Sequence, residues 1–281
     1  GGYFFENETP HVVFWDSPTM RQHTKTLGQV FLHDNNIINK IVALAESETA
    51  TEIIEIGCGK GILTQALNAL NKPILIIEID PRWLDTVKQL NLTNCRYHLG
   101  DVLEYDFLQT PKNTAVIANI PYNITTPIID RLSQYKTQFS AITMMIQKEM
   151  ADRLYGKAGT KAYGSITIFT QYHFDLHKGF KVSRSCFSPP PNVDSYVLKM
   201  TPKTPLLPKK DEPLFFSMVH ALFWGRRKTI QNCLKNAPHI TCKGPFPEHL
   251  STTLKKRGET LDLDALVALF NALKKIIESN V

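Results

Sequence analysis

The spacing of apolar residues changes repeatedly along the first two thirds of the chain, and the changes predict strands separated by helices. Short strand-like runs, most of them continuously apolar, occupy 52–56, 73–80, 94–99, 114–118 and 141–146. Segments with apolar residues three and four positions apart lie between these runs, at 62–70, 81–90 and 125–135. Because buried strands that alternate with helices form parallel sheets, we expect an α/β fold with a doubly wound, Rossmann-like sheet.

The last third of the chain has a different pattern. Two more strand-like runs, 178–182 and 195–200, flank a stretch with three consecutive prolines, and a helix is expected at 163–173. Scattered prolines between 202 and 213 indicate a linker, and helical spacing follows at 214–223, 228–235, 249–254 and 262–277. The sequence therefore predicts two domains: residues 1–205 with the sheet, and residues 206–281 as a small all-helical domain.

The net charge of +6 is concentrated in the C-terminal part of the chain. From residue 202 onward there are thirteen Lys and Arg against seven Asp and Glu, whereas residues 1–201 carry nineteen of each. A basic domain is typical of a protein that binds a polyanion such as RNA, although a basic surface without a partner would look the same. The candidate RNA contacts form two clusters: Arg226, Arg227 and Lys228, and Lys255, Lys256 and Arg257.

The cysteine and histidine spacings argue against a disulfide framework and against a metal site. The five cysteines are odd in number and contain no CxxC pair. His173 and His177 are four residues apart, but no third ligand accompanies them. No apolar run approaches the roughly 20 residues that cross a bilayer, and no signal-peptide pattern opens the sequence. We therefore expect a cytoplasmic protein with reduced thiols and no bound metal.

A glycine-rich loop and a carboxylate predict a nucleoside cofactor. Gly57, Gly59 and Gly61 stand between the strand 52–56 and a helix, where a ligand can approach the backbone closely. The loop is one residue shorter than a dinucleotide fingerprint, which favours a cofactor without a pyrophosphate. Glu78, at the end of the next strand, is placed to accept hydrogen bonds from ribose hydroxyls. A plain tight turn and a solvated strand end are the alternatives.

Two later strand ends carry further candidates. Asp101 can hold the edge of the cofactor's adenine and Val102 can pack on its face, unless Asp101 is an ordinary turn residue. The sequence Asn-Ile-Pro-Tyr at 119–122 follows the strand 114–118. There the oxygen of Asn119 and the carbonyl of Ile120 can accept hydrogens from an exocyclic amine.

Aromatic side chains complete this predicted substrate site. Pro121 stiffens the turn, Tyr122 can stack on a base, and Phe187 is a candidate second stacking face. A simple turn and core aromatic residues remain the alternatives.

In their order along the chain, these motifs resemble the KsgA-type ribosomal RNA adenine dimethyltransferases, the rRNA adenine dimethylase family. The resemblance runs from about residue 25 to residue 273. It is carried by the segments 28–32, 55–61, 78–80, 100–101, 119–122, 147–149, 161–164, 187–195, 226–229 and 257–259. Each segment is a weak signal alone, and their combination in one order is specific.

The resemblance implies an enzyme that transfers methyl groups from S-adenosylmethionine to the exocyclic amines of two adjacent adenosines. These adenosines lie in the 3′-terminal hairpin of 16S small-subunit rRNA, and the reaction is linked to small-subunit biogenesis. The family's cofactor contacts correspond to Leu32, Gly57, Glu78, Asp101 and Asn119. Val30 stands where the family usually has Asn; it is a candidate cofactor contact through its backbone, because valine cannot donate a side-chain hydrogen bond.

The implied partner is small-subunit rRNA or a pre-assembled small subunit, and we expect a monomer. Three alternatives remain: a large-subunit rRNA adenine dimethylase, a non-catalytic RNA-binding assembly factor, and a nicotinamide oxidoreductase. The short glycine loop disfavours the oxidoreductase, and the intact motifs at 57–61 and 119–122 disfavour the non-catalytic factor.

Overall fold

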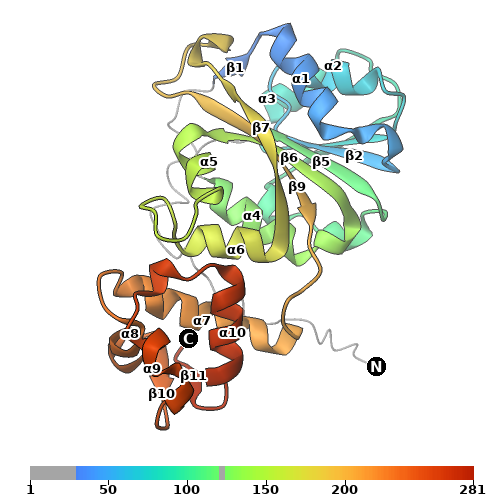
Figure 1. The fold of residues 1–281 in the computed structure, drawn as a ribbon. Helices are drawn as coiled ribbons and strands as arrows, with labels where there is room; N and C mark the ends of the chain where they lie inside the picture. The colour runs from blue at the N-terminus through green and yellow to red at the C-terminus, as the bar shows by residue number, and fades with distance from the viewer. Residues whose placement is uncertain (1–29, 120–123) are drawn as a thin grey trace, which may run out of the picture. The chain divides into compact units, whose positions relative to one another are not determined.

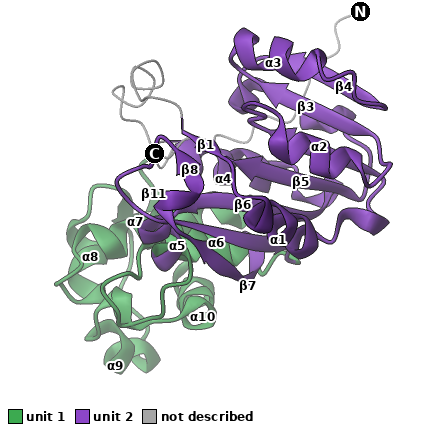
Figure 2. Ribbon diagram, turned by 90° about the horizontal axis from the view of Figure 1, so that it is seen from above, with its two compact units in different colours: residues 1–16, 153–172, 204–281 green, residues 17–152, 173–203 purple. Residues whose placement is uncertain are grey.

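The computed structural model describes residues 30–119 and 124–281 and divides the chain into two compact units (Figures 1 and 2). Of the described residues, unit 2 contains 30–152 and His173–Lys203. Unit 1 contains Arg153–Tyr172 and Thr204–Val281, so one segment from the middle of the chain is grouped with the C-terminal residues. The functional division at residue 205 stays a prediction.

Unit 2 is built on a seven-stranded sheet. The strand order is β4 (Cys95–Leu99), β3 (Ile74–Glu78), β2 (Glu52–Ile56), β5 (Thr114–Asn119), β6 (Phe139–Gln147), β9 (Ser195–Pro202) and β7 (Phe174–Val182). The first five strands are parallel, and β9 runs antiparallel to both of its neighbours. This arrangement confirms the predicted doubly wound sheet. From β2 the chain builds the sheet outward in one direction through β3 and β4, and then in the other direction from β5.

Helices cover both faces of the sheet, as the continuously apolar strands require. Every residue of β2 and β3 is buried. The helices of unit 2 are α1 (Asn35–Ala45), α2 (Ile62–Asn68), α3 (Pro81–Lys88) and α4 (Thr125–Gln134), followed by α5 (Lys148–Leu154), which ends in unit 1. The first three lie on one side of the sheet and α4 lies on the other (Figure 1). The face under α1 to α3 forms one apolar core around Ile53, Ile74 and Ile76.

The starts of α1 and α3 follow from local sequence. Asp34 accepts hydrogen bonds from the backbone amides of Asn36 and Ile37, at 2.9 and 3.1 Å, and so caps α1. Asp80 accepts from the amide of Arg82, and Pro81 occupies the first turn of α3, where its missing N–H costs nothing.

The C-terminal part of unit 1 is helical, as predicted, but it also contains a small sheet. Its helices are α7 (Glu212–Trp224), α8 (Ile230–Asn236), α9 (Ser251–Leu254) and α10 (Leu263–Leu273), and α6 (Ser165–His173) precedes them in the chain. Strands β10 (Ile240–Cys242) and β11 (Ile277–Ser279) pair antiparallel. The prediction of one helix over 262–277 was wrong beyond Leu273, because Ile277 pairs with Cys242 instead.

Short 3-10 helices connect many of these elements. They are η2 (Ser47–Thr49), η3 (Val102–Glu104), η4 (Phe107–Gln109), η6 (Lys136–Gln138), η7 (Arg184–Cys186), η8 (Lys209–Asp211), η9 (Glu248–Leu250) and η10 (Gly258–Thr260). None of the helices within the described residues is long and apolar enough to cross a membrane. Within the same residues, no group of three or more His, Cys, Asp or Glu side chains is placed to hold a metal ion. All five cysteines are described, and they are free thiols.

Candidate functional site

The carboxyl ends of β2 and β5 touch where the sheet order reverses. Ile56, the last residue of β2, pairs with Ala118, so Gly57 and Asn119 emerge side by side. A Cβ atom added to Gly57 would lie 2.6 Å from the carbonyl oxygen of Asn119, and the φ angle of Gly57 is +79°. Both facts require glycine at this position. The glycine loop is therefore held directly against the strand end that carries the predicted substrate amide.

The rest of the glycine loop is equally tight. Gly59 and Gly61 have φ angles of +50° and +88°. The amide of Gly61 donates to the carbonyl of Cys58 at 2.9 Å, and Gly61 caps the start of α2. With no side chains at alternate positions, the backbone of this loop is open to close approach by a ligand.

Glu78 lies beside this loop at the end of β3. Its side chain is only 7% exposed. One carboxylate oxygen accepts from the thiol of Cys58 at 3.6 Å, and the other accepts from the amide of Asp80 at 3.1 Å. A carboxylate has about four lone-pair positions, so two contacts leave room for two hydroxyl donors. Glu78 therefore has the lone pairs that the predicted contact with ribose hydroxyls requires.

A second carboxyl group, Glu55, is buried behind the loop. The hydroxyl of Thr64 donates to one oxygen of Glu55, and the other oxygen has no partner among the described residues. Burial raises the pKa of Glu55 from 4.5 to about 8, and the charge of Glu78 adds to this rise. Burial also raises the pKa of the Cys58 thiol. Near neutral pH the protonated, uncharged form of Glu55 is therefore favoured beside Glu78.

Asp101 and Val102 follow β4 on the same edge of the sheet. The amide of Gly100 donates to the backbone carbonyl of Glu78 at 2.9 Å, which holds this turn against the end of β3. One oxygen of Asp101 accepts from the amide of Leu103 and caps η3. The other oxygen is the atom that can accept from an adenine amine. Val102 is buried, with 6% exposure.

Two segments about 155 residues apart in sequence pair beside the glycine loop. Strand β1 (Phe31–Leu32) runs antiparallel to β8 (Phe187–Ser188), with Leu32 opposite Phe187. The ring of Phe31 lies 3.3 Å from the position that a Cβ of Gly59 would occupy. The sequence did not predict this pairing. It brings Leu32 and Phe187, expected to serve cofactor and substrate respectively, into one small sheet.

The remaining predicted site residues have mixed outcomes. Asn119 is half-buried at the end of β5, and Ile120, Pro121 and Tyr122 lie outside the described residues. Phe187 is only 3% exposed, so its ring packs in the core, and its stacking role stays a prediction. Val30 is partly buried and packs against the same core.

One exposed apolar residue at the site was missed from the sequence. Ile79 directly follows Glu78, and 62% of its surface is exposed. A large apolar side chain exposed at a strand end, next to the carboxylate predicted to bind the ribose, could pack on the face of a flat ring. The sequence did contain a signal for this residue: Ile79 stands between two carboxylates, Glu78 and Asp80, at a place where a solvated turn would favour a polar residue.

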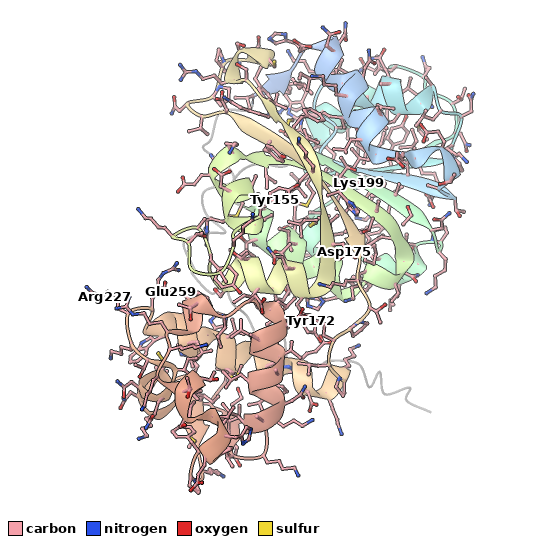
Figure 3. All side chains as sticks on the ribbon, viewed as in Figure 1. Tyr155, Tyr172, Asp175, Lys199, Arg227 and Glu259 are labelled. Carbon is pink, nitrogen blue, oxygen red and sulfur yellow. The ribbon has the colours of Figure 1, made fainter. Side chains whose placement is uncertain are left out.

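The predicted RNA contacts lie in unit 1, where most are exposed. Arg227, Lys228 and the cluster 255–257 are exposed. Arg227 and Glu259 lie at the same edge of unit 1 (Figure 3). Arg226 differs from the others, because its guanidinium donates to the backbone carbonyls of Thr160, Lys161 and Tyr163.

Comparison with known proteins gives a consistent result. The family model described as "Ribosomal RNA adenine dimethylase" matches residues 20–256. A protein named "Ribosomal RNA small subunit methyltransferase A" from Staphylococcus haemolyticus is 39% identical over 269 residues, which cover 90% of this chain and 91% of the relative. Its namesake from Staphylococcus aureus is 37% identical over 267 residues, covering 89% and 90% of the two chains.

Two solved structures are similar over most of the chain. A dimethyladenosine transferase from Plasmodium falciparum superimposes with a TM-score of 0.75 at 29% identity, covering 88% of this chain and 99% of the other. A structure described as the 23S rRNA methyltransferase ErmE gives a TM-score of 0.67 at 26% identity, covering 87% and 99%.

Proposed function

We propose a mechanism for this site from one premise: the chain belongs to the ribosomal RNA adenine dimethylase family. It is an enzyme, an rRNA adenine methyltransferase that uses S-adenosylmethionine. Its substrate is small-subunit rRNA, as the names of the sequence relatives indicate. The proposed products are two adjacent adenosines in the 3′-terminal hairpin of 16S rRNA, each carrying two methyl groups.

The described residues fit S-adenosylmethionine. Gly57, Gly59 and Gly61 leave alternate positions of the loop without side chains, and added Cβ atoms at two of the three would come within 3 Å of their neighbours. Glu78 has lone pairs for both ribose hydroxyls, and the free oxygen of Asp101 suits the adenine amine. Val102 and Ile79 offer apolar surface to the adenine ring, and Leu32 approaches from β1. When bound, the cofactor supplies a methyl group on a sulfonium sulfur.

Asn119 then acts on the target base. An adenine amine is a poor nucleophile because its lone pair is delocalised into the ring. The side-chain oxygen of Asn119 and the carbonyl of Ile120 accept its two hydrogens and draw the nitrogen toward a tetrahedral shape. Positioning and polarisation of this kind can supply most of the rate acceleration. No strong base is needed, because the methylated nitrogen is left with a positive charge and readily loses a proton.

The target base must leave its stack before it can react. Tyr122 and Phe187 are proposed to sandwich the extruded ring, with Pro121 holding the turn that carries Tyr122. For the second methyl transfer only one amine hydrogen remains, so one of the two acceptors loses its partner. The pocket must tolerate both the acceptor left without a hydrogen and the bulk of the added methyl group.

The proposed partner is the rRNA itself or a partly assembled small subunit, with the enzyme acting as a monomer in the cytoplasm. Free thiols at all five cysteines suit a reducing compartment. The contact between Gly57 and Asn119 carries the proposal, because it joins the cofactor loop to the substrate amide at one strand edge.

The decisive experiment offers labelled S-adenosylmethionine and separate preparations of undermethylated small and large ribosomal subunits to the protein. We expect label in small-subunit rRNA only, mapped to two adjacent adenosines near the 3′ end, with four methyl groups per molecule. Label in the large subunit alone would support the large-subunit alternative. Binding without any transfer would support the non-catalytic assembly factor.

A further inference from the structure

Three basic segments that are far apart in sequence lie side by side in unit 1. The amide of Gly159 donates to the carbonyl of Glu259 at 2.8 Å, which joins the loop between α5 and α6 to η10. The amide of Ile230 donates to the carbonyl of Lys256 at 2.8 Å, and Thr229 forms an isolated bridge with Arg257. The segments 157–163, 225–230 and 255–260 therefore form one structural group.

Arg226 fastens this group together. Its guanidinium donates to the carbonyl oxygens of Tyr163 at 2.6 Å, Thr160 at 2.9 Å and Lys161 at 3.2 Å. Its Nε lies 2.6 Å from a carboxylate oxygen of Glu259. A guanidinium has five donors in a rigid fork, and here both terminal nitrogens and Nε face partners within the protein. Arg226 is thus occupied in holding the loop, unlike its exposed neighbour Arg227.

Tyr163 provides a second attachment for the same loop. Its hydroxyl donates to the carbonyl of Leu261 at 2.7 Å, and its side chain is only 2% exposed. The ring packs edge-on against Phe223 at 5.8 Å between centroids. The loop is therefore anchored at Gly159, at Thr160 to Lys161 and at Tyr163.

The anchored loop presents free positive charge on the same group of segments as the two predicted clusters. Lys157 and Lys161 are exposed, and so are Arg227, Lys228 and the three residues 255–257. The acidic Glu259 is paired with Arg226 and also lies 4.0 Å from Arg257, so its charge is directed at these two arginines and not at Lys157 or Lys161. A rigid set of cations from three segments can meet several phosphates of a folded RNA at once, with a smaller ordering cost than a flexible cluster has.

We propose that Lys157 and Lys161 are RNA phosphate contacts, and that Arg226 is a positioning residue that holds them in place. This inference rests on the proposed function, since it names a further part of the RNA surface. It assigns Arg226 a different role from Arg227 and Lys228, with which it forms one basic run in the sequence.

The first test measures binding of the full-length protein to a synthetic hairpin with the sequence of the small-subunit rRNA 3′ end, at several salt concentrations. Each phosphate contact contributes about 0.7 to 0.9 to the slope of log K against log salt. The double variant Lys157→Ala/Lys161→Ala is expected to lower the magnitude of the slope by about 1.5. The control, Lys275→Ala, removes an exposed charge from a different segment of unit 1 and is expected to leave the slope unchanged. A wild-type slope in the double variant overturns the loop contact.

The second test separates positioning from direct contact. Arg226→Ala is expected to speed tryptic cleavage after Lys157 and Lys161 by about 10-fold or more, because opening of the loop exposes its backbone. Arg226→Ala should also lower the magnitude of the salt slope by more than the roughly 0.7 to 0.9 that one phosphate contact contributes. Arg227→Ala should lower the magnitude of the slope by the value of one contact and leave the cleavage rate unchanged. Arg226→Lys lacks the fork and should resemble Arg226→Ala.

The positioning role is overturned if Arg226→Ala leaves the tryptic cleavage rate unchanged and lowers the salt slope by the value of only one phosphate contact. The Lys157 and Lys161 test does not depend on the folding of Arg226 variants, because both lysines are exposed. Binding is measured without methyl transfer, so the two proposals fail separately. If no adenosine is methylated while the slopes change as expected, the proposed function is wrong and the phosphate surface stands.

Discussion

At the scale of single residues, the site depends on a glycine that no other residue can replace. Gly57 combines a φ of +79° with a neighbouring carbonyl oxygen only 2.6 Å from where a Cβ would stand. A side chain would have to adopt a left-handed conformation and also displace the end of β5. Such backbone strain costs of order 1–3 kcal/mol before any clash is counted.

We expect Gly57→Ala to lower the unfolding free energy by about 2 kcal/mol or more and to weaken S-adenosylmethionine binding at least about 10-fold. Urea unfolding and calorimetric titration measure the two effects. Gly164→Ala is the control, because no atom lies within 4 Å of a Cβ there and its φ is not positive. Equal effects of the two substitutions would contradict the close contact between Gly57 and Asn119.

Asn119 provides the second prediction at this scale. Asn119→Ala should reduce turnover by about 10²-fold or more, the typical loss for one oriented polar partner at a reacting centre. Cofactor affinity should change only by a modest factor, because Gly57, Glu78 and Asp101 remain. Single-turnover methylation and cofactor titration on the same preparation distinguish the two effects. Near wild-type methylation would refute the assigned role.

At the scale of elements, the start of α1 ties the cofactor loop to the proline-rich segment. Asp34 caps α1 immediately after β1, and β1 pairs with β8 while Phe31 packs at Gly59. The thiol of Cys186 lies 3.7 Å from the carboxylate of Asp34, on the approach to β8. Asp34 therefore contacts both the start of α1 and the segment that leads into β8.

We expect Asp34→Ala to cost about 1 kcal/mol of stability, the usual value of an N-cap, and Asp34→Asn to cost much less. Chemical denaturation of both variants checks the stability. Because α1 and β1 are joined directly, Asp34→Ala should also weaken cofactor binding a few-fold, whereas Asp34→Asn should not. A large loss in Asp34→Asn would show that charge, not capping, is what matters at this position.

At the scale of the whole molecule, three buried ionisable groups contribute to how stability depends on pH. Burial lowers the pKa of His173 from 6.5 to about 3, and the charge of Lys136 contributes. Burial likewise lowers the pKa of His220 from 6.5 to about 3, with His239 contributing. Glu55 has the opposite behaviour, with a pKa raised from 4.5 to about 8.

Whether stability rises or falls with pH depends on which state, folded or unfolded, binds more protons. As pH falls from about 6.5 toward 3, the unfolded histidines take up protons that the folded ones do not, so stability is lost. As pH rises from 4.5 toward 8, unfolded Glu55 releases its proton first, so stability is also lost. Between 4.5 and 6.5 the two histidines outweigh the one glutamate. These three groups together predict maximum stability near pH 6.5.

Urea unfolding at pH 5, 6.5 and 8 tests this prediction. Glu55→Gln should remove much of the decline between pH 6.5 and 8 while leaving the decline below pH 6.5 unchanged. The amide oxygen of the glutamine can still accept from Thr64, so the packing is largely kept. A decline of the same size above pH 6.5 in the variant would show that another group is responsible.

The sequence by itself determined the order and type of the main elements and the residues at the strand ends. Continuous apolar runs such as 114–118 bury both faces, and glycines at alternate positions after β2 permit only a tight loop; both are local properties. The same reasoning placed Glu78, Asp101 and Asn119 at one edge of a parallel sheet, because every strand that they end runs in the same direction.

Only the tertiary structure decided which distant segments meet. The pairing of Leu32 with Phe187, and of Ile277 with Cys242, involves strands of two or three residues, too short to give a periodic signal. The different roles of Arg226 and Arg227 are likewise invisible in the sequence, where they are adjacent residues with the same charge. They diverge because one guanidinium reaches the carbonyls of a loop more than 60 residues earlier, while the other faces solvent.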